Sequence, residues 1–303
     1  MDAGARASVR ALCSAPRTSS TESPVNTFAR LSRPEVERAL VLFAPVRAVA
    51  QPLFVGLDRI PERRPLLFVG NHTVWGLLDL PFLFAELYEK KGIFLRGLGD
   101  HLHFRIPGWR DLLWKFGAVQ GTREACSALL EAKETVLVFP GGGREVAKRR
   151  GERYRLIWKE RLGFARLAMQ HACTIVPFAA VGVEDALDVV LDSSDVLRTP
   201  VGRALQRLGF RVDILPPLVK GIGPTPLPRP ERLYFEIREP VDPRAHGNDP
   251  NDDGAVRAVR DHVKREIEAG IASLHATRES DPHRRLLPRL ASGVLGIRRS
   301  GTR

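Results

Sequence analysis

Cysteine is scarce in this sequence, whose 303 residues contain only Cys13, Cys126 and Cys173. Three cysteines without a C-x-x-C pair form neither a disulfide framework nor a zinc site of the usual spacing. A reducing, cytoplasmic setting therefore fits best, and we expect no metal ion and no bound cofactor. Cys126 and Cys173 lie within apolar helix and strand patterns, which predicts core packing rather than a nucleophilic role.

Long apolar runs are also missing. No stretch of 18 or more uncharged apolar residues occurs, which argues against a membrane-spanning helix. The nearest is residues 39–57, which Pro45, Arg47 and Pro52 interrupt. Two interpretations stay open for it: an amphipathic segment lying in a membrane interface, or a helix packed on the domain and followed by a strand.

Signatures of other enzyme classes do not occur. The sequence has no G-x-S-x-G, so a serine lipid hydrolase of the usual kind is excluded. Its one run of three glycines, 141–143, is followed by no G-K-[ST] and is not part of a G-x-G-x-x-G, so neither a P-loop nor a dinucleotide fingerprint is present.

Acidic residues are outnumbered, with 35 Asp and Glu against 47 Lys and Arg and a net charge of +12. Such a charge attracts polyanions, whether nucleic acid, an anionic membrane surface or an acidic co-substrate such as a coenzyme A ester. It is equally typical of a solvated basic surface. No nucleic-acid motif is present, so we expect no nucleic acid partner. A non-catalytic basic module that binds membranes stays open as an alternative to an enzyme.

Composition divides the chain into three parts. Residues 1–30 are rich in Ala, Ser, Thr and Arg and have no apolar core of a signal peptide, which predicts a disordered leader. Residues 31–279 are predicted to form the folded domain. Residues 280–303 carry many arginines and are predicted to be a flexible basic tail.

Short apolar runs alternate with amphipathic stretches between residues 52 and 245. This alternation predicts an α/β fold with a mostly parallel central sheet flanked by helices, an amphipathic N-terminal segment and a C-terminal helix over 251–279. Strands are expected at 52–57, 65–70, 92–99, 116–121, 134–140, 173–182 and 232–237, and helices at 77–90, 123–132 and 154–172.

Two stretches carry candidate chemistry. In GNHTVWGLLDLPFL, residues 70–83, a strand ends just before His72, where open α/β sheets collect ligands. A histidine there can take a proton from a hydroxyl, and Asp79 in the next helix can orient its ring. In FPGGGRE, three glycines after a strand let backbone N–H groups approach an anion, and Arg144 follows at once. Taken singly, each pattern is as typical of structural packing as of a site.

Together these features resemble the lysophospholipid/glycerolipid acyltransferase superfamily, whose four signature blocks occur here in order over residues 50–275. The matching residues are Asn71, His72 and Asp79 in the first block, Gly117, Thr122 and Arg123 in the second, Phe139, Pro140, Gly142 and Arg144 in the third, and Pro177 in the fourth. The pattern P-G-G-x-R-E, with Tyr154, Trp158, Arg161, Gly163 and Phe164 after it, looks closer to the diacylglycerol acyltransferase-like branch, which acylates neutral lipid alcohols.

The sequence departs from the superfamily pattern at two places. The histidine and aspartate are separated by six residues instead of four, as if Gly76 and Leu77 were inserted. Gly141 and Gly143 replace the Glu and Thr of F-P-E-G-T-R. Since the resemblance implies that this Glu helps to hold a glycerol phosphate, its absence favours a neutral glyceride or long-chain alcohol as acceptor. A lysophospholipid or glycerol phosphate remains the alternative.

The resemblance implies direct acyl transfer from acyl-CoA or acyl carrier protein to a lipid hydroxyl, with no acyl-enzyme. His72 would be the general base, oriented by Asp79, in an acyltransferase domain bound peripherally to an anionic membrane surface at its cytoplasmic face. The expected substrate-binding residues, with glycine N–H groups stabilising the oxyanion, are Asn71, Arg123, Gly141, Gly142, Gly143 and Arg144.

Overall fold

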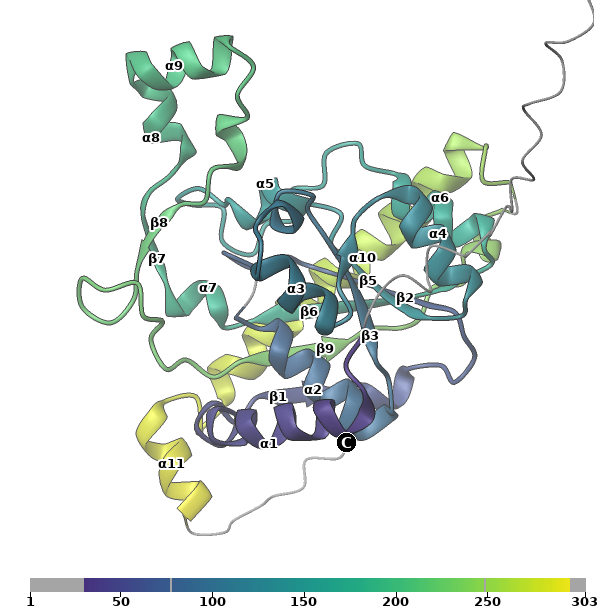
Figure 1. Ribbon diagram of the computed structural model, residues 1–303. Coiled ribbons are helices and arrows are strands. Elements are labelled where there is room, and N and C mark those ends of the chain that lie inside the picture. Colours follow the sequence, from purple (N-terminus) through teal and green to yellow (C-terminus); the bar gives the residue numbers. More distant parts are fainter. Residues whose placement is uncertain (1–29, 77, 248, 295–303) are drawn as a thin grey trace, which may run out of the picture.

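A seven-stranded sheet forms the centre of the protein in a computed structural model that describes residues 30–76, 78–247 and 249–294 (Figure 1). The strand order is β1-β9-β6-β2-β5-β3-β4, and every pairing is parallel except that of β6 with β9. The strands are β1 (Leu53–Val55), β2 (Leu66–Gly70), β3 (Leu95–Gly99), β4 (Val119–Gln120), β5 (Thr135–Val138), β6 (Thr174–Val181) and β9 (Tyr234–Ile237). The predicted α/β fold with a mostly parallel sheet is confirmed, and these are the seven strands expected from the sequence.

The central strand β2 positions the candidate site. It pairs with β5 on one side and β6 on the other, and all of its residues are buried. A strand covered on both faces reads as a continuous apolar run, which is why LLFVG shows no alternation. Leu67 and Val69 face one core cluster, while Leu66 and Phe68 face the other.

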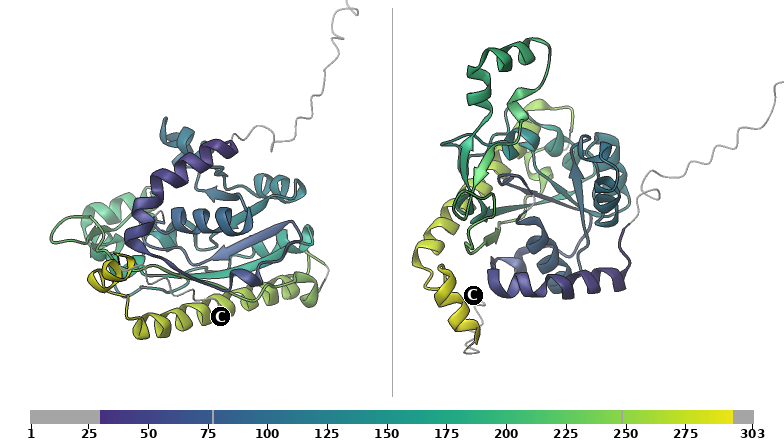
Figure 2. Two further views of the ribbon diagram at one scale, coloured as in Figure 1. Left: turned by 90° about the horizontal axis from the view of Figure 1, so that it is seen from below. Right: turned by 60° about the vertical axis from the view of Figure 1, so that its left-hand side comes forward.

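Helices cover both faces of the sheet, as the left view of Figure 2 shows. On one face lie α4 (Arg123–Glu131), α6 (Gly163–Gln170) and the long α10 (Asp253–Ser280). On the other lie α1 (Arg33–Ala50) and α2 (Leu80–Lys91). The C-terminal helix predicted over 251–279 is thus α10, capped by the Asp252 carboxylate, which accepts from the N–H groups of Gly254 and Ala255.

Between β6 and β9 the chain builds an arm that the sequence did not predict. It contains α7 (Val183–Ala186), β7 (Asp188–Leu191), α8 (Ser193–Arg198), α9 (Pro200–Arg207) and β8 (Leu218–Lys220). The strands β7 and β8 form a separate antiparallel pair. The helices α8 and α9 stand off from the body at the upper left of Figure 1. The remaining short elements are α3 (Trp109–Lys115), α5 (Gly142–Val146) and single 3₁₀ turns at Leu57–Arg59, His103–Arg105, Val212–Ile214 and Pro243–His246.

Two sequence-based predictions fail in part. The helix expected over 154–172 is formed only by α6, because Tyr154 and Lys159 adopt positive φ angles in the loop before it. The tail expected to be flexible over 280–303 contains α11 (Leu286–Val294). Arg289 of this helix is fully buried and donates to the carbonyls of Val49 and Pro230, which docks α11 on the body. The predicted leader, 1–30, lies outside the described residues except for Arg30.

The segment 39–57 forms helix α1 followed by strand β1, as the second interpretation predicted, and its location in a membrane interface stays a prediction. None of the helices in the described ranges is both long and apolar enough to cross a membrane.

Candidate active site

His72 lies in the connection after the carboxyl end of β2, as the sequence predicted. Its imidazole stacks on the Phe139 ring with 4.0 Å between centroids and 12° between planes. Phe139 follows β5, the parallel neighbour of β2, so the first and third signature blocks meet at one edge of the sheet. A Cβ on Gly76 would lie 2.1 Å from His72 Cε1, so the imidazole is held between Phe139 and Gly76.

Asn71 was expected to bind substrate, but the structure gives it another role. The side chain is fully buried, and its amide donates to the Ala180 carbonyl at 2.9 Å while accepting from the Ala180 N–H at 2.8 Å. The amide thereby pairs with the backbone of β6 beyond the last residue of β2. Asn71 fixes the direction in which the chain leaves the sheet, and so positions His72.

Asp79 was expected to hold the imidazole, and the hydrogen bond that this requires is not formed. Its Oδ1 accepts from the Thr73 hydroxyl at 3.2 Å, and the residue starts α2. Within the described residues, Nδ1 of His72 is buried and has no hydrogen-bond partner. Burial raises the pKa of the Asp79 carboxyl to about 6. Asp79 is therefore a buried carboxyl near the histidine, bonded to Thr73 rather than to the ring.

The imidazole is neutral at physiological pH. Burial lowers the pKa of His72 to about 3, and the positive charges of Lys148 and His103 add to the effect. A neutral ring has a lone pair with which to accept a proton. The same environment disfavours the imidazolium. Transfer of a proton to His72 therefore requires a negative charge close to the ring, which stabilises the imidazolium.

A buried ion pair lies behind the histidine and was not foreseen. Lys148 and Glu184 are both almost completely inaccessible and bond to each other directly. Glu184 also accepts from the backbone N–H of Tyr154. The Tyr154 hydroxyl donates to Asp185 at 2.5 Å and accepts from the Gly182 N–H at 3.0 Å. This network fixes the loop after α5 against α7.

Glu145 fills the space that the missing glutamate of the third block would need. A Cβ on Gly141 would lie 1.9 Å from Glu145 Oε2. Glu145 is fully buried, and neither carboxyl oxygen has a hydrogen-bond partner among the described residues. Burial raises its pKa to about 7, opposed by Lys148. A carboxyl is thus present beside the glycine loop, supplied from α5 instead of from position 141.

Arg144 is held by contacts with the segment that follows it. Its guanidinium is buried, donates to Glu152 at 2.6 Å and to the Ala147 carbonyl at 3.1 Å, and has no contact with Glu145 that would qualify as an ion pair. The expectation that it binds a polar head group therefore has no support in this geometry. The arginine instead braces the loop that follows α5.

Arg161, rather than Arg144, contacts the glycine loop, residues 141–143. Gly142 has φ +49°, and a Cβ on it would lie 2.7 Å from Nη1 of Arg161. That nitrogen donates to the Pro140 carbonyl at 2.8 Å. The Gly142 N–H donates to the Phe139 carbonyl, so the N–H groups of Gly141 and Gly143 are the candidates for an oxyanion.

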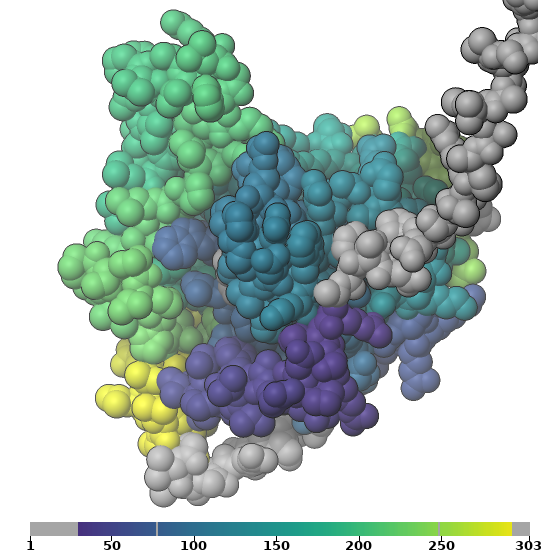
Figure 3. All heavy atoms as spheres, viewed as in Figure 1, coloured from purple at the N-terminus to yellow at the C-terminus, as the bar shows by residue number. Residues whose placement is uncertain are grey.

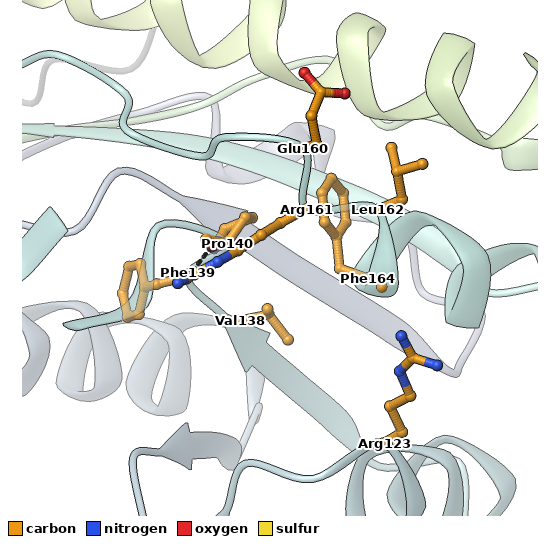
Figure 4. A pocket seen from close by; sticks show the side chains of 9 residues that line it. Arg123, Val138, Phe139, Pro140, Glu160, Arg161, Leu162 and Phe164 are labelled. Carbon is orange, nitrogen blue, oxygen red and sulfur yellow. Dashed lines mark hydrogen bonds between the residues drawn. The ribbon is translucent and has the colours of Figure 1, made fainter. Parts of the chain in front are cut away.

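A cavity of about 420 Å³ lies beside this loop (Figure 4). Arg161 reaches over Pro140, Arg123 enters from the start of α4, and Phe164 lies between them. Arg123 was predicted to bind substrate, and the structure places it on this cavity. Its lining residues are Arg123, Val138, Phe139, Pro140, Glu160, Arg161, Leu162, Gly163 and Phe164.

A second hollow of about 660 Å³ is lined mostly by apolar side chains and runs between α1, α2 and the Pro228–Glu231 segment. Leu78 and Val183 in its wall directly precede Asp79 and Glu184, so the hollow adjoins the buried charges. Its lining residues are Phe43, Pro45, Val46, Val49, Ala50, Leu78, Pro81, Phe82, Val183, Ala186, Pro228, Arg229, Pro230, Glu231, Leu233 and Arg289.

The described residues contain neither a reactive cysteine nor a cluster of metal ligands. Burial raises the pKa of both Cys126 and Cys173 to about 12, so neither supplies a thiolate nucleophile. No group of three or more His, Cys, Asp or Glu side chains is arranged to hold a metal ion in that part of the chain.

Comparison with known proteins agrees with the four signature blocks, all of which lie within the matched residues. The family model described as Acyltransferase matches residues 51–181. Phytyl ester synthase 1, chloroplastic, from Arabidopsis thaliana is 33% identical over 78% of this chain and 36% of its own length. The DGAT1/2-independent enzyme synthesizing storage lipids from Bos taurus is 33% identical over 43% of this chain and 38% of its own. The chain thus spans little more than a third of these relatives.

A solved structure, the 1-acyl-sn-glycerophosphate acyltransferase PlsC from Thermotoga maritima, is 18% identical, covers 78% of this chain and 80% of its own, and has a TM-score of 0.46. Over residues 51–181 the chain thus matches the Acyltransferase family, and over most of its length it is similar to phytyl ester synthase 1.

Proposed function

We propose that this protein transfers a fatty acyl group from acyl-CoA or acyl carrier protein to the hydroxyl of a neutral glyceride or long-chain alcohol. The observation that carries the proposal is the neutral His72 ring stacked on Phe139 beside a loop of three glycines. The base and the candidate oxyanion donors come from the ends of two adjacent parallel strands. This is the arrangement that attack of a hydroxyl on a thioester requires.

The proposed reaction has two stages. The acceptor oxygen attacks the thioester carbonyl while its proton passes to His72, and the oxyanion is stabilised by the N–H groups of Gly141 and Gly143. Collapse of the tetrahedral intermediate breaks the carbon–sulfur bond, and the leaving thiolate recovers the proton from the imidazolium. The developing negative charge offsets the cost of protonating this partly buried ring. Asp79 contributes its charge and orients the segment through Thr73.

Three features support a neutral acceptor. The space at Gly141 is filled by the Glu145 carboxyl, which repels a phosphate when ionised. Arg144 is already paired with Glu152. The apolar hollow beside Leu78 suits an acyl chain or a long alcohol. By its name, the relative phytyl ester synthase forms phytyl esters.

A phosphate-bearing acceptor is the second candidate. Arg123 and Arg161 both line the smaller cavity, and the net charge of +12 favours an anion. The same charge supports peripheral binding at the cytoplasmic face of an anionic membrane, where exposed Val41 and Leu42 of α1 would enter the interface.

Competition between acceptors tests the proposal. One acyl-CoA donor is offered with diacylglycerol, a long-chain alcohol, lysophosphatidate or glycerol 3-phosphate, and ester formation is measured for each. We expect diacylglycerol or the alcohol to be acylated at least tenfold faster. A preference for either phosphate-bearing acceptor contradicts the neutral-acceptor assignment. If no acyl group is transferred to any of the four acceptors, from acyl-CoA or from acyl carrier protein, the acyltransferase proposal is wrong and the non-catalytic basic module is favoured.

A further inference from the structure

The arm carries a helix whose apolar side chains face solvent. Val201 of α9 is 69% exposed. Leu208 and Phe210, which follow the helix, are 75% and 62% exposed. Gly202 lets the helix approach α8 closely, since a Cβ there would lie 2.0 Å from the Val196 carbonyl oxygen. Contact with α8 therefore uses the glycine and leaves the larger apolar side chains uncovered.

The helix is amphipathic. Val201, Leu205 and Leu208 follow at steps of four and three, which places them along one side. Arg203 and Arg207, four residues apart, lie on the opposite side with Gln206. Short helices with an apolar side and an arginine-rich side lie in the interfacial layer of membranes.

Charge points to an anionic surface. From Val196 to Val212 the sequence has four arginines and no Asp or Glu. Arg198 and Arg211 have ion pairs of 3.7 Å with the flanking Asp195 and Asp213. Arg203 and Arg207 have no ion pair among the residues that the structure describes. Their charges are available to a partner.

We propose that the α8–α9 arm is a membrane anchor, with Val201, Leu208 and Phe210 entering the interface of a bilayer that contains anionic lipid. In Figure 3 the arm, α3 and α1 all appear on one face of the molecule. Each segment has exposed apolar side chains, including Leu112 of α3 and Leu42 of α1. A bilayer with anionic lipid offers an apolar layer and negative head groups together, which matches the apolar and the arginine-bearing sides of α9. The inference is independent of which lipid is acylated.

Vesicle flotation tests the anchor without donor or acceptor present. The full chain is mixed at 0.1 M salt with vesicles of phosphatidylcholine and phosphatidylglycerol, or of phosphatidylcholine alone. We expect Leu208→Ala/Phe210→Ala to lower the partition constant for the mixed vesicles at least tenfold. Arg203→Gln/Arg207→Gln should reduce binding to the mixed vesicles and leave binding to pure phosphatidylcholine unchanged.

Gln206→Ala, on the opposite side of the same helix, is the matched control and should bind as the wild type. Unfolding temperature shows that each variant is folded, since the replaced side chains are exposed. Wild-type binding by the Leu208/Phe210 variant overturns the proposal. So does self-association that is lost in this variant and unaffected by vesicles, which would make the arm an interface between two copies of the chain. Because no reaction is measured, failure of the acyltransferase proposal is separately visible.

Discussion

At the scale of single residues, Gly76 constrains the position of the His72 ring. Its φ is +62°, and a side chain at this position would overlap His72. The second of the two apparent insertions, residue 77, lies outside the described residues. The first insertion, Gly76, lies against the imidazole of His72, and only glycine leaves room for the ring.

We predict that Gly76→Ala lowers kcat/KM at least tenfold while the protein stays folded. The control is Gly92→Ala, because Gly92 has the same φ of +62° and no atom within 4 Å of an added Cβ. Both variants should lose about 1–2 kcal/mol of stability from the left-handed backbone. Only the change at 76 should reduce acyl transfer. Equal activity of the two variants would show that Gly76 does not constrain the base.

Glu145 is predicted to make stability depend on pH. Its pKa of about 7 in the folded protein is above the ordinary 4.5, so the folded state binds more protons between these values. The stabilisation from the protonated carboxyl is present below pH 4.5 and is lost as pH rises through 7. Glu145→Gln removes this loss. Relative to wild type, the variant should gain about 3 kcal/mol on going from pH 5 to pH 8.5.

Urea unfolding at the two pH values measures this difference, with Glu62→Gln as the variant that removes a charge from an exposed position. A stability difference between Glu145→Gln and wild type that is the same at both pH values would mean that the carboxyl is ionised or solvated throughout.

The residues of the site were foreseen unevenly. His72 and the three glycines were predicted because each follows an apolar strand, and a strand end is a local signal. The substrate-binding roles expected of Asn71 and Arg144 stay predictions, and the contacts of both side chains are instead with backbone groups and Glu152. The sequence does not tell a polar side chain that bonds the backbone from one that faces a ligand. The Lys148–Glu184 pair joins residues 36 apart and exists only once α7 packs against the loop. The one hint was the sequence R-E-V-A-K, which places charges within an otherwise apolar motif.

At the scale of elements, the strands were predictable and the arm was not. The central strands β2, β5 and β6 are apolar runs bounded by turns, because strands buried on both faces need no alternation. In α9 and the residues after it, Val201, Leu208 and Phe210 face solvent, so a hydrophobic pattern that is interpreted as burial does not identify this helix. The helix expected over 154–172 is an error of another kind. The apolar spacing fits a helix, but Trp158 is buried from a loop in which Tyr154 and Lys159 have positive φ angles.

The basic tail shows the same limit at the C-terminus. Its arginines predict solvation, but Arg289 is held between α1 and the Pro228–Glu231 segment by three backbone carbonyls, those of Val49, Arg284 and Pro230. An arginine with its donors satisfied by carbonyls is stable when buried. Sequence alone does not show which arginine has such partners.

At the scale of the whole molecule, the topology explains why one site forms. Parallel pairing of β2 with β5 brings His72 and Phe139 to the same edge of the sheet. Val138, Phe139 and Pro140 at the end of β5 also line the smaller cavity. In the proposed reaction, the donor and the acceptor meet the base where these two strand ends lie side by side.

The most direct test of the account is the rate of acyl transfer by His72→Ala on vesicles that contain the preferred acceptor. His101→Ala is the matched control, because His101 is exposed and lies on another loop. We predict a loss of about 10²–10⁴-fold for the change at His72, with unchanged unfolding temperature and vesicle binding, and no loss for the control. Activity of His72→Ala within a few-fold of wild type would contradict the assignment of the base and with it the mechanism.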